Sequence, residues 1–290
     1  MSLASHYQGR FGLSYELFPP KTAQGEAALF ESLQRLVAFR PDYITCTYGA
    51  GGSTRDKTLD IITEVRRRFG LPVASHLTCV GSTVDQLREY LTEARERGIE
   101  YIVALRGDPP RGESSFRAVP GGLCYANELV ALIRSEFPNF AIAVAGYPET
   151  HQEATSPDAD LENLKRKVDA GADIVITQLF YNNEDYFRFC DRCEQIGIDV
   201  PIVPGILPVT NLAQIQRITS LCKAALPPAF VERLAQQDDT DWQHQVGVEQ
   251  ATQQVGELME RGAPGVHFYV LNKSRATCEV LTALGRPCHA

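Results

Sequence analysis

The sequence predicts a single-domain α/β protein, a (βα)8 or TIM barrel, from three features. Short apolar segments of strand length alternate with amphipathic helical segments throughout the chain. Polar side chains follow most of these apolar segments, at the end where such barrels place their sites. The 290 residues also suit one barrel and contain no linker or change of composition. We therefore expect residues 1–290 to form one catalytic barrel with its site at the carboxyl ends of the strands.

The strand at residues 102–105 shows the pattern most clearly. This apolar run has no polar interruption, as expected of a strand that is buried on both faces. Arg106 and Asp108 follow it directly, and Pro109 and Pro110 prevent a helix from starting at once. Both charged side chains are therefore predicted to lie on a loop at the carboxyl end of this strand.

The remaining elements follow from apolar spacing and from glycine and proline at their ends. The other predicted strands are 11–18, 43–46, 73–77, 140–145, 173–177, 201–206 and 265–270. The predicted helices are 26–38, 55–69, 84–97, 126–136, about 158–171, 184–195, 211–222, an extra one within 226–239, 242–261 and 275–284. These segments make eight strand–helix units.

Composition and charge exclude several classes of protein. The formal net charge of −8 argues against nucleic acid as the main partner, because phosphate neutralisation needs clustered cations. No apolar run is long enough to cross a bilayer, and residues 1–10 lack the apolar centre of a secretory signal, so we expect a cytoplasmic protein with no membrane association. The eight cysteines are then expected to be reduced. Cys190 and Cys193 share one face of a predicted helix without a histidine or a second cysteine pair nearby, which disfavours a metal or redox site.

Three strand ends carry candidate functional groups, each with a structural alternative. Glu16 stands among Tyr15, Leu17 and Phe18, where a carboxylate is costly unless it is neutral, paired or functional; position alone favours a catalytic acid and a structural ion pair about equally. The glycine-rich loop at residues 47–54 allows backbone N–H groups to approach a ligand, although such loops are more often simple turns. His76 lies on a predicted strand, where a lone histidine is usually structural.

Two further segments complete the candidate site. Residues 111–122 are polar and glycine-rich, and they form a candidate lid or specificity loop. In the helix near 158–171, Asp160, Asn163 and Lys167 share one stripe with Arg166 beside it. This stripe is either a solvated face or a nucleotide site, with a carboxylate for hydroxyl groups and cations for phosphate. The basic run at 165–167 is the local patch that a small anionic ligand would need.

Collected in order, these strand ends resemble one enzyme family over nearly the whole chain. The matching segments are YELFPP at 15–20, TYG at 47–49, HLTC at 76–79, ALRGD at 104–108, YPE at 147–149 with His151, NLKRKVDAG at 163–171, ITQ at 176–178, PGILP at 204–208 and FYVLN at 268–272. Each segment is weak alone, but together they resemble bacterial methylenetetrahydrofolate reductases, which are FAD-dependent barrels of one-carbon metabolism and methionine biosynthesis. The resemblance implies NAD(P)H-dependent reduction of 5,10-methylenetetrahydrofolate to 5-methyltetrahydrofolate by ping-pong hydride transfer through bound FAD.

The family reaction implies roles for three residues. Protonation at N10 opens the folate ring to an iminium cation that accepts the hydride, and the resemblance assigns this general-acid role to Glu16. A carboxyl group in apolar surroundings keeps its proton nearer to neutral pH, and the sequence neighbours of Glu16 are apolar. Asp108 is implied as a catalytic residue close to both flavin and pterin, where its charge could stabilise the iminium while making the flavin harder to reduce. Gln178 is implied to bind folate and nicotinamide in turn.

The resemblance also implies which residues bind the ligands. Those expected to bind FAD are Thr47, Tyr48, His76, Arg106, Gly107, Asp108, Tyr125, Ala126, Tyr147, His151, Asp160, Asn163, Arg166 and Lys167. Those expected to bind the folate substrate are Glu16, Asp108, Gln178, Gln214 and Lys273. Two positions depart from the pattern: Ile218 replaces a phenylalanine of some members, and Lys273 replaces an arginine, so bidentate binding of a carboxylate is lost there.

Other aspects of function are left open by the sequence. It does not decide between NADH and NADPH, although the bacterial resemblance favours NADH, and it permits an accessory subunit or another electron donor. Relatives associate, so a homo-oligomer is expected. A flavin-free lyase or aldolase that uses Glu16 and Asp108, or a non-catalytic module that binds flavin or folate, remains the alternative.

Overall fold

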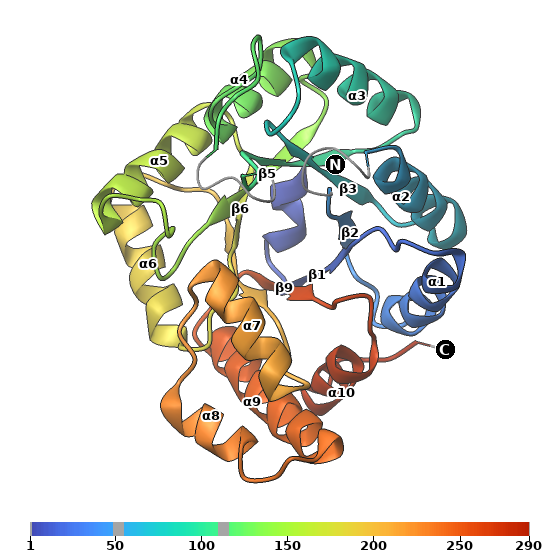
Figure 1. Ribbon diagram of the computed structural model, residues 1–290, viewed down its shortest axis with the longest axis vertical. Helices are drawn as coiled ribbons and strands as arrows, with labels where there is room; N and C mark the ends of the chain where they lie inside the picture. The colour runs from blue at the N-terminus through green and yellow to red at the C-terminus, as the bar shows by residue number, and fades with distance from the viewer. Residues whose placement is uncertain (1, 49–54, 110–115, 290) are drawn as a thin grey trace.

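The computed structural model describes residues 2–48, 55–109 and 116–289, which build a ring of parallel strands surrounded by helices (Figure 1). The strands are β1 (Gly12–Leu17), β2 (Tyr43–Cys46), β3 (Val73–Thr78), β4 (Tyr101–Leu105), β5 (Ala141–Gly146), β6 (Ile174–Thr177), β7 (Ile202–Val203), β8 (Gly205–Ile206) and β9 (Gly265–Tyr269). Their order in the sheet is β7-β6-β5-β4-β3-β2-β1-β9-β8.

The ring closes through β7 and β8, which together form the predicted strand at 201–206. Pro204 separates them, and a proline has no backbone N–H with which to continue a ladder. β7 pairs with β6 on one side, whereas β8 pairs with β9 on the other. The carbonyl oxygen of Pro204 still accepts a hydrogen bond from the backbone N–H of His267, at 2.9 Å. The two short pieces therefore occupy one strand position, and the predicted (βα)8 barrel is confirmed.

Helices cover the outside of this ring, with bounds close to those predicted. They are α1 (Ala23–Val37), α2 (Arg55–Phe69), α3 (Val84–Glu96), α4 (Ala126–Glu136), α5 (Pro157–Asp169), α6 (Asn183–Gln195), α7 (Leu212–Cys222), α8 (Pro228–Leu234), α9 (Thr240–Glu260) and α10 (Arg275–Ala283). The predicted extra helix is α8, which lies beside α9 (Figure 1). In the described part of the chain, none of the helices has both the length and the apolar character needed to span a membrane.

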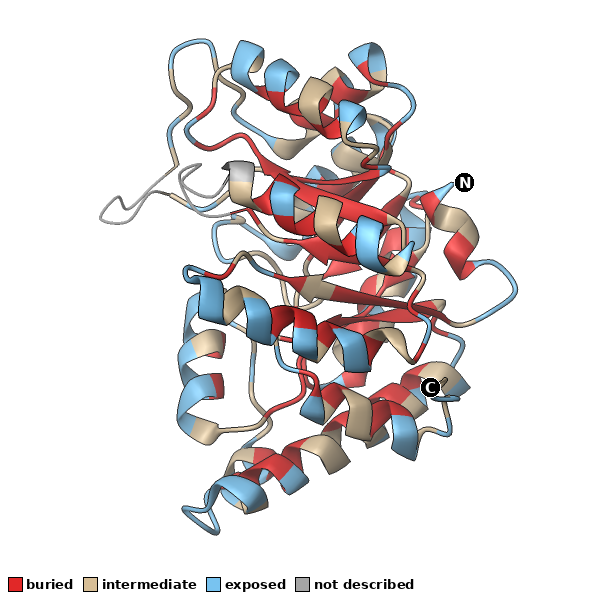
Figure 2. Ribbon diagram, turned by 90° about the vertical axis from the view of Figure 1, so that its right-hand side faces the viewer, coloured by how far each residue is buried: buried red, intermediate tan, exposed pale blue. Residues whose placement is uncertain are grey.

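Side chains alternate between two cores along each strand. Tyr15 and Leu17 of β1 belong to the larger core between strands and helices, whereas Ser14 and Glu16 point into the barrel. Figure 2 shows the strands as a buried layer between helices whose outer faces are exposed. The smaller core fills the barrel with Tyr43, Ala74, Tyr101, Val103, Ala143, Ile174, Ile176 and Val203.

The amino end of the barrel is closed by a short 3-10 helix, η1 (Leu3–Tyr7), that the sequence analysis did not predict. Figure 1 places this turn at the centre of the ring. Leu3 and Tyr7 join the interior core, where Leu3 is fully buried. The ring of Tyr7 fits because Gly12 and Gly265 lie beside it: a Cβ at either position would approach a Tyr7 ring carbon to within 2.6 or 2.7 Å.

Two glycines of α9 provide a matched test of this packing. A Cβ on Gly247 would lie 1.7 Å from the backbone oxygen of Val209, so Gly247→Ala is expected to reduce the free energy of unfolding by about 3 kcal/mol or more. A Cβ on Gly256 would meet only Leu284 at 3.6 Å, so Gly256→Ala is expected to raise that free energy by about 0.5–1 kcal/mol through helix propensity. Urea unfolding of both variants measures the difference, and equal effects would contradict the close contact of Gly247 with Val209.

Candidate active site

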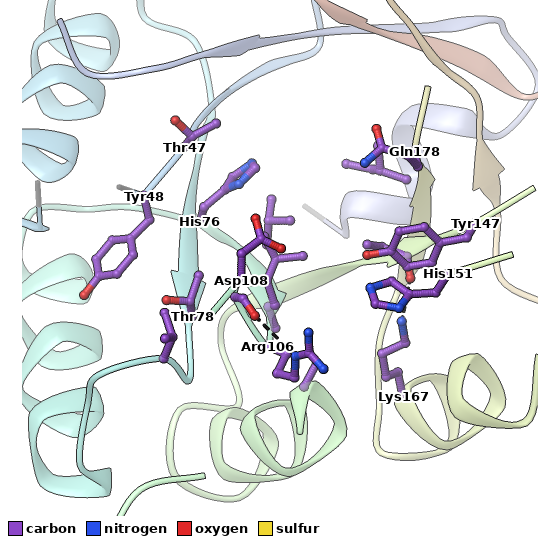
Figure 3. Close-up of a pocket in the computed structure, with 18 of the residues that line it drawn as sticks. Thr47, Tyr48, His76, Thr78, Arg106, Asp108, Tyr147, His151, Lys167 and Gln178 are labelled. Atoms are coloured by element: carbon purple, nitrogen blue, oxygen red, sulfur yellow. Dashed lines mark hydrogen bonds between the residues drawn. The ribbon is translucent and has the colours of Figure 1, made fainter. Parts of the chain in front are cut away.

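A cavity of about 970 Å³ opens at the carboxyl ends of the strands (Figure 3). Its walls come from the ends of β1 to β6 and β9 and from the start and inner side of α5. The predicted site residues that line it are Glu16, Thr47, Tyr48, His76, Arg106, Gly107, Asp108, Tyr125, Ala126, Tyr147, His151, Asp160, Asn163, Arg166, Lys167 and Gln178. The barrel therefore brings together residues that are far apart in the sequence. Glu16 and Gln178, for example, are separated by 162 positions. Their ligand-binding and catalytic roles stay predictions.

Glu16 lies in the cavity wall between two histidines. Its Oε2 is 3.4 Å from Nε2 of His76 on β3 and 3.9 Å from Nε2 of His267 on β9. The side chain is 19% exposed. Because it opens into the same cavity as Asp108 and Gln178, it can act on one ligand together with them.

The apolar sequence neighbours of Glu16 do not surround its carboxyl group, and this interpretation from the sequence was wrong. The hydroxyl of Tyr15 donates to the carbonyl of Leu36, and Leu17 packs in the outer core. Phe18 is 38% exposed. Strand alternation turns Tyr15 and Leu17 to the opposite face, so imidazoles and strand-end groups form the surroundings of the carboxyl group.

The two histidines next to Glu16 differ in their partners. Burial lowers the pKa of His76, and the nearby Glu16 opposes that effect only in part. His76 is therefore neutral around pH 7 and does not form a full ion pair with Glu16. His267 is 1% exposed, and its Nδ1 lies 2.8 Å from the hydroxyl of Ser14.

Asp108 and Gln178 stand on different walls of the cavity (Figure 3). Asp108 is exposed at the end of β4. Gln178 follows β6, and its Oε1 accepts a hydrogen bond of 2.8 Å from the backbone N–H of Leu179. That contact fixes the amide, and among the described residues the side-chain NH2 group has no protein acceptor. Gln178 can therefore donate hydrogen bonds to a ligand.

Cations gather on the side of the cavity formed by β4, β5 and α5. Lys167 donates from Nζ to the carbonyl of Ala145 at 2.6 Å, and burial lowers its pKa to about 8. Arg106 forms two hydrogen bonds with Glu153, at 2.6 and 2.8 Å. Arg166 is 61% exposed at the rim. Lys165, the third member of the predicted basic patch, instead pairs with Asp169 and does not line the cavity.

The segment after β5 connects these cations to an acidic group. Tyr147 and His151 pack edge to face, with ring centroids 4.6 Å apart. The backbone N–H of His151 donates to the Asp160 carboxylate at 2.9 Å. Burial lowers the pKa of His151, which favours the neutral imidazole. The hydrogen bond to Asp160 holds this loop against the start of α5.

Two predicted substrate residues, Gln214 and Lys273, lie outside the main cavity. They line an adjoining cavity of about 570 Å³. Leu207, Tyr269 and Leu271 line both cavities, so the two are neighbours. Ile218, one of the two departures from the family pattern, lines the main cavity.

Several residues of the cavity wall were not predicted from the sequence. They include Thr78, Glu153, His267 and Tyr269. Thr78 and His267 occupy inward positions two residues from His76 and Tyr269, so strand alternation was the signal that could have found them. The hydroxyl of Thr78 is buried and has no hydrogen-bond partner in the described part of the structure. It is therefore available to a ligand.

Several predicted features lie partly or wholly outside the described residues. These are the glycine positions of the loop at 47–54 and the first part of the candidate lid at 111–122. At the end of that candidate lid, Gly122 forms an isolated bridge with Thr83. Residues 49–54 and 110–115 lie outside the described part of the chain.

The cysteines form no disulfide, and all eight are free thiols. Burial raises the pKa of Cys190 to about 11 and that of Cys193 to about 12, so both are protonated at neutral pH. A protonated thiol is a poor nucleophile and metal ligand. Among the described residues, no group of three or more histidine, cysteine or acidic side chains is arranged to hold a metal ion.

Solved structures with a similar fold include one that binds a folate. A protein from Clostridium thermocellum, described as binding two copies of 5-methyl-5,6,7,8-tetrahydrofolic acid, has a TM-score of 0.65 and 16% identity over 97% of each chain. An oxaloacetate acetylhydrolase has a TM-score of 0.51 and 14% identity over 98% of this chain and 82% of its own. At such identities these likenesses concern the fold alone.

Sequence relatives are much more similar. The 5,10-methylenetetrahydrofolate reductase of Escherichia coli is 42% identical over 96% of this chain and 92% of its own. Methylenetetrahydrofolate reductase (NADH) 1 of Arabidopsis thaliana is 39% identical over 96% of this chain, which corresponds to 49% of the plant protein. The family model described as methylenetetrahydrofolate reductase matches residues 2–285. With its barrel and its strand-end cavity, the chain belongs to the methylenetetrahydrofolate reductase family.

Proposed function

We propose that this protein reduces 5,10-methylenetetrahydrofolate to 5-methyltetrahydrofolate, with NAD(P)H as the electron donor and FAD as the bound hydride carrier. Membership of the family supports the reaction. The observation that carries the proposal is the position of Glu16, whose carboxyl group lies in the wall of the same cavity as Asp108 and Gln178. The proposed reaction needs one acid and two polar groups around a single ligand, and these three residues could supply them.

The residues on one side of the cavity fit FAD. Lys167, Arg106 and Arg166 supply positive charge for a diphosphate, and Asp160 supplies a carboxylate for ribose hydroxyls. The unpartnered hydroxyl of Thr78 and the 60% exposed ring of Tyr125 add a polar contact and an aromatic face. When bound, FAD would accept two electrons as a hydride from the nicotinamide and deliver them to the folate.

Glu16 acts on the folate rather than on the flavin in this proposal. Its proton passes to N10 of the substrate, the carbon–nitrogen bond of the five-membered ring opens, and the resulting iminium accepts the hydride. The neutral state of His76 favours this role, because a protonated imidazole 3.4 Å away would hold Glu16 as a carboxylate. Asp108 supplies negative charge near the cation that forms.

A single cavity favours a ping-pong sequence. Gln178 offers its NH2 group to whichever ligand occupies the site, because its Oε1 is already bonded to the chain. Nicotinamide and folate would therefore bind in turn, each after the other has left. The adjoining cavity with Gln214 and Lys273 is available to the part of the folate that extends beyond the ring system.

Flavin absorbance and anaerobic titration test the function as a whole. The purified protein should be yellow, and NADH or NADPH should bleach its flavin in stopped-flow mixing. Methylenetetrahydrofolate should then restore the absorbance of the oxidised flavin. A colourless protein that does not bind added FAD would favour a lyase or aldolase, and a flavin that neither nucleotide reduces would favour a binding module.

Replacement of the acid should separate the two half-reactions. Glu16→Gln removes the transferable proton, so we expect flavin reduction by NADH to stay within about threefold of wild type and folate reduction to fall by several orders of magnitude. The matched control is Glu100→Gln, at an exposed position just before β4 and at the opposite end of the barrel, which should change neither rate. Retained folate turnover in Glu16→Gln would remove Glu16 from the mechanism.

The buried cation should control FAD retention. Lys167→Ala is expected to raise the FAD dissociation constant more than it slows either half-reaction, whereas Lys165→Ala, whose side chain pairs with Asp169, should leave that constant unchanged. Fluorescence titration with FAD measures both. An unchanged dissociation constant in Lys167→Ala would refute the assignment.

The pH dependence of FAD binding gives a second measurement. Lys167 is charged below its lowered pKa of about 8 and neutral above it in the FAD-free protein. Binding of an anion above this pH must therefore take up a proton, so affinity should be flat below about pH 8 and weaken above it by up to about tenfold per pH unit. The wild-type slope should disappear in Lys167→Ala.

A further inference from the structure

One side chain ties the turn after β9 to the end of β1. Nδ2 of Asn272 donates to the backbone carbonyl of Phe18 at 2.8 Å, and its Oδ1 accepts from the backbone N–H of Phe18 at 3.1 Å. We propose that Asn272 is a positioning residue for the reduction of folate, because it sets the place of Leu271 in this turn relative to Glu16. This inference rests on the proposed function. Asn272 was not among the residues predicted from the sequence to bind a ligand or to act in catalysis.

The two hydrogen bonds continue the pairing of β1 with β9 beyond the end of the ladder. Within the ladder, Glu16 is the partner of Tyr269, which is the last residue of β9. After that residue the pairing is made by side-chain atoms, because the Asn272 amide offers one donor and one acceptor to the same backbone unit. Phe18 lies two positions after Glu16 in the chain, so the tie acts close to the proposed acid.

The turn itself has an uncommon backbone conformation. Residues 270–273 form a turn that is closed by a hydrogen bond of 2.8 Å from the backbone N–H of Lys273 to the carbonyl of Val270. Both central residues have positive φ, 48° at Leu271 and 56° at Asn272. Asparagine tolerates this left-handed conformation, whereas a bulky leucine adopts it only at a cost. Such strain is kept where the side chain serves a function, which directs attention to Leu271.

The side chain of Leu271 lies on the boundary between the two cavities. This boundary consists of the residues that line both of them, Leu207, Tyr269 and Leu271. Leu207 is buried directly after β8, and the hydroxyl of Tyr269 donates across the barrel to the carbonyl of Thr177 at 2.6 Å. These two are therefore fixed by the barrel. The position of Leu271 depends instead on the turn, and so on the tie between Asn272 and β1.

The proposed substrate has chemistry that fits this boundary. Its polar ring system is joined through N10 to a benzoyl ring, which carries glutamate at the other end. With the ring system in the main cavity and the glutamate in the adjoining one, the benzoyl ring crosses the boundary. N10 is bonded directly to the benzoyl ring, so a contact that places this ring also places the atom that Glu16 protonates. A displaced turn would leave the acid intact and misplace its acceptor.

The location of Asn272 makes its effect selective. Asn272 itself lines neither cavity, so it acts only through the residues that it holds. The cations proposed to hold FAD lie around β4, β5 and α5, on other walls of the main cavity. Loss of the tie should therefore affect the reaction of the flavin with folate and leave FAD retention unchanged.

Asn272→Gly tests the inference, because glycine tolerates the positive φ and lacks the amide. In FAD-loaded enzyme, flavin reduction by NADH should stay within about twofold of wild type, as should the FAD dissociation constant. Reoxidation by methylenetetrahydrofolate should slow by about tenfold in its limiting rate. The substrate concentration for half-maximal rate should change by less than about threefold, because every cavity-lining side chain remains.

Further variants make the result specific. Leu271→Ala shortens the side chain at the boundary and keeps the tie, so it should mainly raise the substrate concentration for half-maximal rate, by about fivefold. Asn139→Gly replaces an exposed turn asparagine before β5, at the amino end of the barrel, and should change neither half-reaction. If Asn272→Gly does not fold, Asn272→Asp keeps the acceptor for the Phe18 N–H and removes the donor, and it should slow reoxidation in the same direction.

Three results would overturn the inference. The first is wild-type reoxidation in Asn272→Gly or in its Asn272→Asp substitute. The second is an equal loss in both half-reactions or weaker FAD binding, which a merely structural role would give. The third is an unchanged concentration for half-maximal rate in Leu271→Ala. Failure of the proposed function is distinct from all three, because it appears as absent folate reduction in the wild type or as retained turnover in Glu16→Gln.

Discussion

The alternation of side chains along eight parallel strand positions is the constraint on which the site depends. It separates Tyr15 and Leu17, which face the helices, from Ser14 and Glu16, which face the barrel. The same alternation brings His76 and His267 to the inner surface at the level of Glu16. A shift of β1 by one residue would place a phenol in the cavity wall and the carboxyl group among the helices. Packing of Tyr15 and Leu17 in the outer core therefore fixes the inward orientation of Ser14 and Glu16.

The cations of the cavity and the carboxyl group of Glu16 lie on different walls. Lys167, Arg106 and Arg166 lie around β4, β5 and α5, whereas Glu16 and the two imidazoles lie at β1, β3 and β9. Burial shifts the pKa values of His76 and Lys167 in the same direction, toward the neutral form. The neutral imidazole of His76 therefore meets Glu16 as a dipole rather than as a full charge. This suits the proposed role of Glu16 as a general acid, because a permanent ion pair would hold its carboxyl group in one protonation state.

Much of this arrangement could be predicted from sequence. Runs such as 102–105 identify strands, and the prolines after Asp108 show that Arg106 and Asp108 lie on a loop, which the structure confirms. The remainder depends on tertiary contacts that local patterns do not encode. The five residues of η1 are too few to show a helical period in the sequence. The break at Pro204 is visible only in the structure, where β7 pairs with β6 and β8 pairs with β9. The environment of Glu16 was misjudged because sequence neighbours on a strand are not spatial neighbours.

The pairing of Arg106 with Glu153 has a consequence for the empty cavity. A guanidinium in a cavity wall would be costly to leave without a counter-charge, and Glu153 supplies one from within the chain at 2.6 and 2.8 Å. The guanidinium of Arg106 is thus paired without any anionic ligand. Because Glu153 is 40% exposed, its carboxylate can be exchanged for another oxyanion with little loss of hydration. The same side chain can therefore be paired in the empty cavity and still be released to an incoming anion.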